Sequence, residues 1–443
     1  MMPPTGREHC QGLPPDILSD LHDNVIDVIL MFLPCKDAVR TSVLSRKWKY
    51  HWCRLAKWKF DESLWSTQKD KLYPTVKFRK IVYQLLTHHE GPITKFKLDI
   101  TYLQECPRID NFIFFLSRKD IQHLVLHLPP GKDELYRLPS SIFICSQLRH
   151  LNIHNCSMHH HPSACEGFDR LISLELCRVT ISSELLGHLI SHCPLLEKLV
   201  LKIAKTLNIT EINAPMLRSF DFIGSISSIC LKNVPLLAKV SLICENSSME
   251  AEKFDYAKFF QSRSALEHLI LNFRYSQFFA DEAPTRLPYY LNRVKHLNLS
   301  HVELKESYTR SCAHCLIRSF PHLEYLKIEV LSRRLVYDEA DSGIQESLEL
   351  EHFSDVTFNH LREVEIISFS GTTPEMQLIK ILLAKSPVLV KMYIDPGILI
   401  DTGSEILTEL VNFHRASPEA EIDLEYYGKL ELNRLETNVD GVV

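Results

Sequence analysis

Two stretches of this 443-residue chain concentrate side chains that could bind a metal ion. One is CSMHHHPSAC (156–165), and the other is CAHC (312–315), which holds the only Cys-x-x-Cys pair. Zinc sites favour Cys and His, but usually in spaced pairs that converge as a tetrahedron. Three adjacent histidines cannot easily aim at one ion, and the Cys-x-x-Cys pair has no second pair downstream. We therefore predict a surface loop at the first stretch, buried cysteines at the second, and no metal.

A third stretch mixes cations with aromatic rings, which is chemistry suited to nucleic acids. Residues 36–59 hold eight Lys or Arg and one acidic residue, interleaved with Trp48, Tyr50, Trp52 and Trp58. The whole chain nevertheless carries a net charge of −5, whereas proteins that neutralise phosphates along their length are usually basic. We interpret the tryptophans as core and interface anchors, and the lysines as a solvated face that could steer an acidic partner. Nucleic-acid binding is not expected and stays a minor alternative.

Enzyme motifs are missing from the sequence. The 13 glycines are never closer than six residues apart, which excludes both G-x-G-x-x-G and the P-loop. Neither G-x-S-x-G nor H-E-x-x-H occurs, and no pair of carboxylates stands out as an acid–base dyad. We predict no catalytic residue and no cofactor, and hence a protein that binds other molecules.

Composition places the chain among ordinary globular proteins, with 45% hydrophobic and 24% charged residues. No apolar run approaches the roughly 18–20 residues that span a bilayer. The first 20 residues lack the apolar segment of a secretory signal, so we interpret the 13 cysteines as reduced thiols. These features favour the nucleus or the cytoplasm, and no membrane association is expected.

A short apolar pattern recurs through most of the chain, and it predicts the elements that must position any site. The pattern is apolar-x-x-apolar-x-apolar, and most copies start 20 to 29 residues apart. The copies are 148–153, 171–176, 196–201, 217–222, 237–242, 266–271, 294–299, 323–328, 361–366 and 389–394, with weaker ones at 93–98 and 121–126. One 38-residue interval contains the acidic segment LVYDEADSGIQESLELE (335–351), which we expect to be a loop.

The pattern has a simple structural reason. Alternate residues of a strand point to opposite faces, so the last two apolar positions of each copy point inward together. One unit cannot bury its own apolar face, but a stack of units makes a continuous core. The period is typical of leucine-rich repeats, and we predict an irregular α/β leucine-rich-repeat solenoid.

The segment DNVIDVILMFLP (23–34) predicts a helix that is apolar nearly all round. Val25, Val28, Ile29 and Phe32 share one face, and Ile26, Leu30 and Leu33 form a second face beside it. Pro34 ends this helix, and Asp37 and Ser45 are plausible N-caps for two further helices over 38–43 and 46–55. Three helices so short make a marginal core. We therefore expect a dedicated partner to cover the second face, with the adjoining repeats as the alternative cover.

The segment DLHDNVIDVILMFLPCKDAVRTSVLSRKWKYHWCRL (20–55) resembles an F-box, in particular the plant version. With the repeats behind it, the chain resembles the plant F-box/FBD/leucine-rich-repeat family. HLREVEIISFSGTTPEMQLIKILLAKSPVLVKMYID (360–395) and LVNFHRASPEAEI (410–422) are similar to its FBD region. The resemblance divides the chain into a flexible N-terminus (1–16), a three-helix F-box (17–60), leucine-rich repeats (61–359), an FBD-like region with the last repeats (360–427) and a tail (428–443).

In that family the F-box docks on a Skp-type adaptor, which connects it to the cullin and RING subunits of an SCF ubiquitin ligase. The resemblance implies a non-enzymatic substrate receptor for an unknown protein target. The docking positions carried over are Leu21, Ile26, Ile29, Leu30, Leu33, Pro34, Val43, Leu44 and Trp48. One departure is His22, where the family usually has proline after the leucine. It leaves open an alternative, a protein-interaction scaffold with weak or no adaptor binding.

A target would bind the outward strand positions of the repeats, the usual docking face of such solenoids. Mixed charge with Tyr and Asn at these positions suits a protein surface. By register we predict as target-binding residues His150, Asn152, His268, His296, Asn298, Tyr325, Lys327 and Tyr393.

Overall fold

A computed structural model of the chain describes residues 17–64, 74–103, 106–131, 134–159, 168–203, 210–224, 229–244, 252–253, 259, 265–274, 276–277, 283–287, 291–331, 353–396 and 403–424. The predicted flexible N-terminus (1–16), the acidic segment (335–351) and the tail (428–443) lie outside these ranges. The chain forms two compact units, Met1–Ser157 and Met158–Val443, and we describe each by itself.

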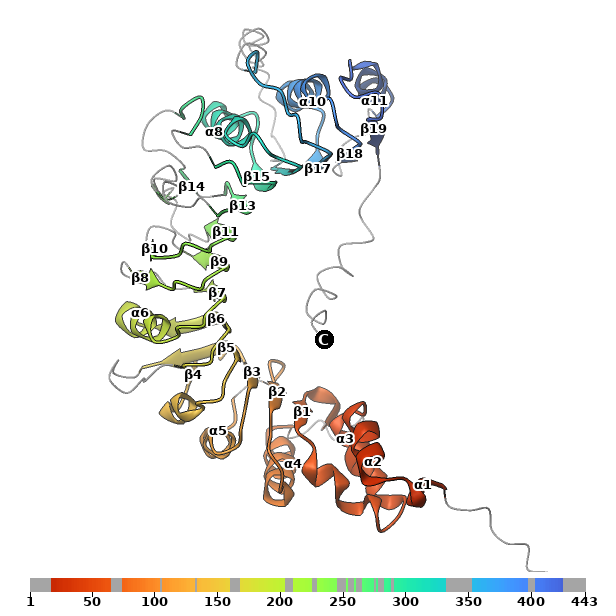
Figure 1. Cartoon of the computed structure of the whole chain (residues 1–443), viewed down its shortest axis with the longest axis vertical. Coiled ribbons are helices and arrows are strands. Elements are labelled where there is room, and N and C mark those ends of the chain that lie inside the picture. The colour runs from red at the N-terminus through yellow and green to blue at the C-terminus, as the bar shows by residue number, and fades with distance from the viewer. Residues whose placement is uncertain are drawn as a thin grey trace, which may run out of the picture. The chain divides into compact units, whose positions relative to one another are not determined.

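The first unit starts with short helices (Figure 1). They are α1 (Ile17–Asp20), α2 (Asp23–Met31), α3 (Cys35–Arg40) and the 3-10 helices η1 (Thr41–Val43) and η2 (Trp48–Arg54). The predicted N-caps are wrong. Pro34 is the N-cap of α3, since its fixed φ (here −54°) and missing N–H cost nothing at a helix start, and Asp37 lies inside that helix. The N-cap of η2 is Lys47, so the last predicted helix is a 3-10 helix that begins after Ser45.

A parallel sheet follows in the same unit, in the order β1-β2-β3-β5, with β4 beside the end of β5. Aromatic rings fill the inward side: Phe60 of β1 and Phe96 of β2 both contact Phe112 of α5, at 6.4 and 4.7 Å between ring centroids. Helix α5 therefore covers the inward face of the first strands (Figure 1). The bounds are β1 (Lys57–Phe60), η3 (Glu62–Leu64), α4 (Pro74–His88), β2 (Lys95–Asp99), α5 (Asp110–Ser117), β3 (His123–His127), β4 (Tyr136–Arg137), η4 (Ser140–Ile144) and β5 (His150–Met158).

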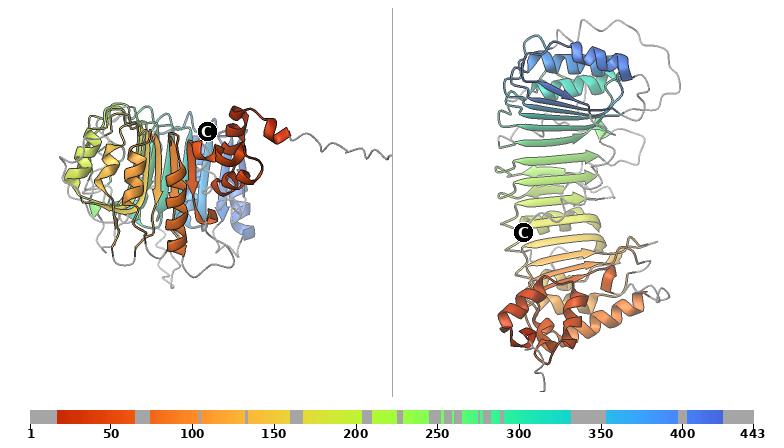
Figure 2. Two further views of the ribbon diagram at one scale, coloured as in Figure 1. Left: turned by 90° about the horizontal axis from the view of Figure 1, so that it is seen from below. Right: turned by 90° about the vertical axis from the view of Figure 1, so that its right-hand side faces the viewer.

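The second unit continues with parallel strands in the order β6-β7-β9-β11-β13-β15-β16-β17-β18-β19. The strands lie side by side, with α6, α8 and α10 on one side of the sheet (Figures 1 and 2). Their bounds are β6 (Ser173–Ile181), α6 (Ser183–Ser191), β7 (Lys198–Lys202), β9 (Ser219–Gly224), β11 (Lys239–Cys244), β13 (His268–Asn272), β15 (His296–Val302), α8 (Ser307–Arg318), β16 (Tyr325–Val330), β17 (Glu363–Phe369), α10 (Thr373–Lys385), β18 (Lys391–Pro396), α11 (Gly403–Asn412) and β19 (Glu421–Asp423). Short pairs form beside this sheet: β8 (Thr210–Asn213) with β10 (Ile229–Lys232), and β12 (Glu252–Lys253) with β14 (Ser276–Gln277).

Each of the twelve predicted copies of the apolar pattern contains the start of a strand, two residues after its first apolar residue. Leu323, Leu326 and Ile328 are an example: all three are buried, and β16 begins at Tyr325. Strand β1 was not predicted, although Leu55, Trp58 and Phe60 follow the same pattern. Because β1 pairs with β2, the repeat sheet begins inside the range predicted for the F-box. Within the described residues, no helix is both long and apolar enough to cross a bilayer.

Several strands contain a residue with left-handed backbone near their carboxyl ends. Asn155, Arg178, His301 and Ser368 have φ between 52° and 59°, and each stands five residues after its strand begins. The registers of β15 and β17 with their next strands shift at this point, as in a β-bulge. At each of these two shifts three residues of the bulged strand oppose two of the next strand, and the pairing then continues.

Gly371 lies at the turn before α10, and its replacement by alanine should destabilise the second unit. Its φ is +74°, and an added Cβ would lie 2.5 Å from Cδ1 of Ile406. Left-handed backbone alone costs an alanine about 1–2 kcal/mol, so we expect at least that loss in the free energy of unfolding. Guanidinium unfolding followed by circular dichroism measures it.

Gly187→Ala is the matched control for Gly371→Ala. Gly187 lies inside α6, and its added Cβ would come no closer than 3.4 Å to the Glu211 carbonyl oxygen. Alanine is favoured over glycine in helices by up to about 1 kcal/mol, so this variant should be neutral or stabilised. Equal effects of the two variants would contradict the assignment of strain to Gly371.

Acid should destabilise the first unit through His89. Its Nδ1 donates to the Cys53 carbonyl oxygen at 2.6 Å, while Nε2 is buried without a partner among the described residues. Burial, helped by the charge of Lys119, lowers the pKa of His89 to about 4. The unfolded chain, with a histidine pKa near 6.5, therefore binds the proton first as pH falls. Stability should be lost from about pH 6.5 down to about pH 4, by at most about 1.4 kcal/mol per pH unit.

Tryptophan fluorescence measures this pH dependence, because the four tryptophans all lie within residues 48–65 of the first unit. Unfolding by guanidinium at several pH values gives the slope, and His89→Gln removes the titrating group. The variant should lose less stability between pH 6.5 and 4 than the wild type. An unchanged slope would show that His89 is not the group responsible.

Candidate functional site

The helix α2 divides its apolar side chains between core and solvent, and this division creates the candidate site. Ile26 and Leu30 are buried, as the periodicity of an amphipathic helix requires. Val25 and Val28 stay 44% and 47% exposed, and Phe32, just after the helix, is 84% exposed. Exposed apolar side chains this close together mark a binding surface more often than a solvated one.

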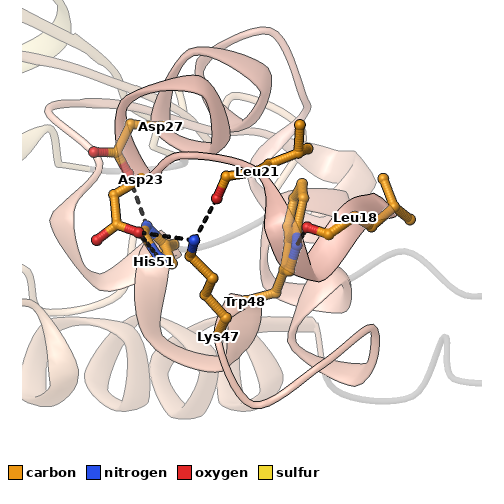
Figure 3. Close-up of polar contacts among 7 residues, drawn as sticks. All are labelled: Leu18, Leu21, Asp23, Asp27, Lys47, Trp48 and His51. Atoms are coloured by element: carbon orange, nitrogen blue, oxygen red, sulfur yellow. Dashed lines mark hydrogen bonds and ion pairs between the residues drawn. The ribbon is translucent and has the colours of Figure 1, made fainter. Parts of the chain in front are cut away.

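Polar contacts from η2 fix the orientation of α2 (Figure 3). Lys47 donates to the carbonyl oxygen of Leu21 and forms an ion pair with Asp23 at 3.4 Å, in the first turn of α2. One turn later, Nδ1 of His51 lies 3.0 Å from Oδ1 of Asp27. An acidic residue at a helix N-terminus is also favoured by the helix dipole. These contacts keep Val28 and Phe32 turned away from the core.

A second group of exposed apolar side chains lies on and beside η1. Val43 is 86% exposed and Leu44 is 48% exposed. Both were carried over from the resemblance as docking positions, together with Leu21, Ile29, Leu33 and Pro34, which are half-buried or exposed. We define the F-box surface as Val25, Val28, Met31, Phe32, Val43 and Leu44. Val25, Val28, Met31 and Phe32 were not among the predicted docking residues. Val25, Val28 and Phe32 belong to the first predicted face of this helix. The expectation that a partner covers the second face is wrong for Ile26 and Leu30, which the core of the chain itself buries.

The structure corrects the place of three predicted docking residues. Ile26, Leu30 and Trp48 are at most 2% exposed in the free chain, so they offer no surface to a partner. The indole Nε1 of Trp48 donates to the Leu18 carbonyl oxygen at 2.8 Å (Figure 3), which satisfies its polar group in the core. An F-box this small needs these large side chains for its own core.

His22 has the backbone turn that the family resemblance would assign to a proline at this position. Its φ is −62°, within the range that a proline ring imposes, and its carbonyl accepts from the backbone N–H groups of Val25 and Ile26. The presence of His22 instead of the expected proline therefore leaves the start of α2 in place.

The basic and aromatic run does not form a stacking platform. Trp48 and Trp58 are buried, and Trp58 lies 5.0 Å from the His89 ring in a T-shaped contact. Trp52 is half-buried, and its indole donates to the Lys49 carbonyl oxygen at 3.1 Å. These three tryptophan rings pack against other parts of the first unit. The mixture of cations and aromatic rings therefore supports nucleic-acid binding less than the sequence alone suggested.

The cysteines considered as metal ligands are buried wherever the structure describes them. Cys312 and Cys315 lie inside α8, and burial raises the pKa of their thiols to about 12 and about 11. Cys156 is buried in β5, where burial raises its pKa to about 12. A thiol binds metal as the thiolate, which these pKa values disfavour. His159 is exposed, and residues 160–167 of the histidine-rich stretch lie outside the described residues.

The outward sheet face of the second unit brings together six of the predicted target-binding residues. One row holds His268, His296 and Tyr325, with the two imidazole rings stacked at 4.2 Å. The next row holds Asn298, Lys327 and Tyr393, separated by Glu365, which pairs with Lys327 at 3.3 Å. These side chains are half-buried, and together they form a face of mixed charge.

His150 and Asn152 belong to the first unit, where they lie on β5. The ring of His150 stacks on His123 of β3 at 4.4 Å, and His154 stacks on His127 at 4.1 Å.

Comparison with known proteins agrees with this architecture. The F-box domain family model matches residues 18–60. A second family model, described as FBD-associated F-box protein At5g56370, LRR repeats, matches residues 109–328. The matches fall on the short helices with the exposed apolar side chains, and on the strands of the repeats.

Curated relatives extend the likeness over almost the whole chain. F-box/FBD/LRR-repeat protein At1g13570 of Arabidopsis thaliana is 32% identical over 418 residues, covering 93% of this chain and 99% of the relative. FBD-associated F-box protein At5g22730 of the same plant is 25% identical over 92% of this chain and 94% of its own length. F-box/LRR-repeat protein At3g03360, also from this plant, is 26% identical over 45% of this chain and 40% of its own length. The chain therefore belongs to the plant F-box/FBD/leucine-rich-repeat protein family.

Proposed function

We propose that this chain is the substrate-recognition subunit of an SCF ubiquitin ligase. The F-box surface would bind a Skp-type adaptor, and through it the cullin and RING subunits. The repeats would bind the target protein. The single observation that carries the proposal is the exposure of Phe32 and Val43 on an F-box whose core is already complete without them.

The energetics favour a partner over solvent at this surface. Burying an apolar side chain of this size stabilises a complex by about 1.5–3 kcal/mol, and aromatic anchors dominate such interfaces. The clamp of Lys47 and His51 holds α2 in place before binding, so little ordering is needed. The surface therefore has the chemistry of a preorganised docking site.

The proposed role is positioning rather than catalysis. Holding a target near a ubiquitin-loaded partner raises its effective concentration without any bond chemistry by this chain. The outward face of the repeats, with His268, His296 and Tyr325, is the proposed target side, and the nucleus or the cytoplasm is the proposed place.

Co-expression tests the proposal directly. The full chain with a Skp-type adaptor should elute as one complex in size-exclusion chromatography, and addition of a cullin–RING pair should shift it further. If the adaptor and the folded chain elute separately, the ligase role fails and the alternative of an interaction scaffold stands.

The variant His22→Pro tests whether the histidine at this position weakens adaptor binding. Because φ at His22 already suits proline, adaptor affinity should change by less than about threefold.

A further inference from the structure

The solvent face of the sheet in the first unit carries a cluster of lysines that the functions above leave unexplained. Lys57 and Lys59 alternate with the buried Trp58 and Phe60 along β1. Lys95 and Lys97 alternate with the buried Phe96 and Leu98 along β2. The parallel register sets Lys57 opposite Lys95, and Lys59 opposite Lys97. We define these four residues as the lysine face.

The lysine face works against the stability of the sheet. Neighbouring strands lie about 4.8 Å apart, and like charges directly opposite each other destabilise the pair. Lys59 forms an ion pair with Asp61 at 3.3 Å. In the part of the chain that the structure describes, Lys57, Lys95 and Lys97 form no ion pair. The stability of the fold therefore does not explain why two pairs of opposed lysines lie next to each other.

Three lysines on the sheet face of the second unit each have a carboxylate nearby. There the register provides a carboxylate on a neighbouring strand, close enough for an ion pair. The pairs are Lys198 with Glu175 at 2.6 Å, Lys327 with Glu365 at 3.3 Å, and Lys391 with Asp423 at 3.8 Å. The fold thus neutralises these three lysines within the sheet, whereas Lys202 and Lys239 of the same unit form no ion pair among the described residues. On the lysine face the counter-charge has to come from outside this sheet.

The positive potential reaches the next strand. His123 follows Lys95 in the register and is stacked on His150. Burial first, and then His150, Lys95, Arg149 and Lys57, lower the pKa of His123 to about 4. Both the half-buried ring and its cationic neighbours oppose a further charge there. Any anion that bound among these lysines would therefore raise the pKa of His123 again.

We infer that the lysine face binds an extended acidic segment of the recruited target protein, one with Asp or Glu at alternate positions. This inference rests on the proposed role as a substrate receptor. Alternate side chains of an extended peptide are about 6.6 Å apart, the same spacing as Lys57 and Lys59 along β1. Such a segment lying along the strands would place each carboxylate between two opposed ammonium groups and remove their repulsion.

A nucleic acid fits the lysine face less well. The aromatic rings of β1 and β2 point inward, so no ring on these strands is available for base stacking. Asp61 and Asp99 lie at the end of the lysine rows, with Asp99 accepting from Thr101 at 3.0 Å. Because β1 and β2 are parallel, both carboxylates lie at the same end of the lysine face, where they would repel a polyanion that continued past this end.

Fluorescence anisotropy with the full chain tests the inference. The probe is a fluorescein-labelled peptide of alternating glutamate and serine, and the variant is Lys95→Glu with Lys97→Glu. The control is Arg79→Glu with Lys80→Glu, which makes the same charge change on exposed residues of α4. At low salt we expect the lysine-face variant to weaken binding at least about tenfold and the control by less than about twofold. Equal losses, or none, would overturn the inference.

Further measurements separate this inference from the proposed function. Adaptor binding of the same variants should be unchanged, and its loss in Lys95→Glu with Lys97→Glu would assign the lysine face to the adaptor instead. Single-stranded DNA of matched charge should bind more weakly than the peptide, and tighter binding would overturn the peptide assignment. In NMR the peptide should raise the pKa of His123. A wild-type chain that binds the peptide but not the adaptor would refute the ligase role alone.

Discussion

Replacing both Phe32 and Val43 by aspartate should abolish binding to a Skp-type adaptor while the F-box stays folded. Both side chains are more than 80% exposed, so the substitutions leave the core intact. In the complex each would bury a carboxylate where an apolar anchor belongs, and such anchors contribute 2 kcal/mol or more. The pair should therefore reduce affinity by at least about 100-fold, which isothermal calorimetry measures.

The control for this surface is an equal change elsewhere. Val76 of α4 and Val411 of α11 are 63% and 61% exposed and lie outside the F-box. Val76→Asp with Val411→Asp should keep adaptor affinity within about twofold. Circular dichroism should give the same thermal midpoint for both double variants. If Phe32→Asp with Val43→Asp still binds like the wild type, the F-box surface is not the adaptor site.

Trp48→Ala should lower the free energy of unfolding of the first unit by about 3–5 kcal/mol. The substitution empties a fully enclosed site and leaves the Leu18 carbonyl oxygen without its indole donor. This is a large share of the 5–15 kcal/mol that stabilises a typical domain. Guanidinium unfolding monitored by circular dichroism measures the loss.

Trp52→Ala is the matched control for Trp48→Ala. Trp52 is half-buried, and its indole donates to Lys49 of the same 3-10 helix, so its loss should cost clearly less. Adaptor binding by Trp48→Ala should fall only as far as the F-box unfolds. A variant that keeps full stability but loses the adaptor would restore Trp48 as a contact residue, as the family resemblance implied.

The repeats show why a short pattern predicted the strands well. In each copy the three apolar positions are inward positions, and burial is a local property of alternating side chains. The pattern at Leu55, Trp58 and Phe60 is as clear, yet the family resemblance assigned these residues to the F-box. A segment can match both the F-box and the apolar pattern of the repeats. Only the pairing of β1 with β2 shows that this segment forms a strand of the repeat sheet.

The F-box shows the limit of the same reasoning. The amphipathic pattern of residues 23–33 revealed more apolar surface than one core needs, but the prediction left the wrong face for a partner. Ile26 and Leu30 of that face are buried, and Val25, Val28 and Phe32 of the other face are exposed. Family positions then placed Ile26, Leu30 and Trp48 at the surface together with Val43 and Leu44. Burial in the folded chain separates these two groups, and Lys47 and His51 are the contacts that set the rotation of α2.

The sequence alone determined the class of this protein: an F-box, parallel repeats behind it, and no motif for catalysis, because periodicity and motif spacing are properties of neighbouring residues. The tertiary structure decided which apolar side chains remain exposed and which lysines stand opposite one another. Those facts depend on contacts between residues 20 to 40 positions apart, such as Lys47 with Leu21 and Lys57 with Lys95. No local pattern contains such contacts, so the candidate docking surfaces became visible only in the folded chain.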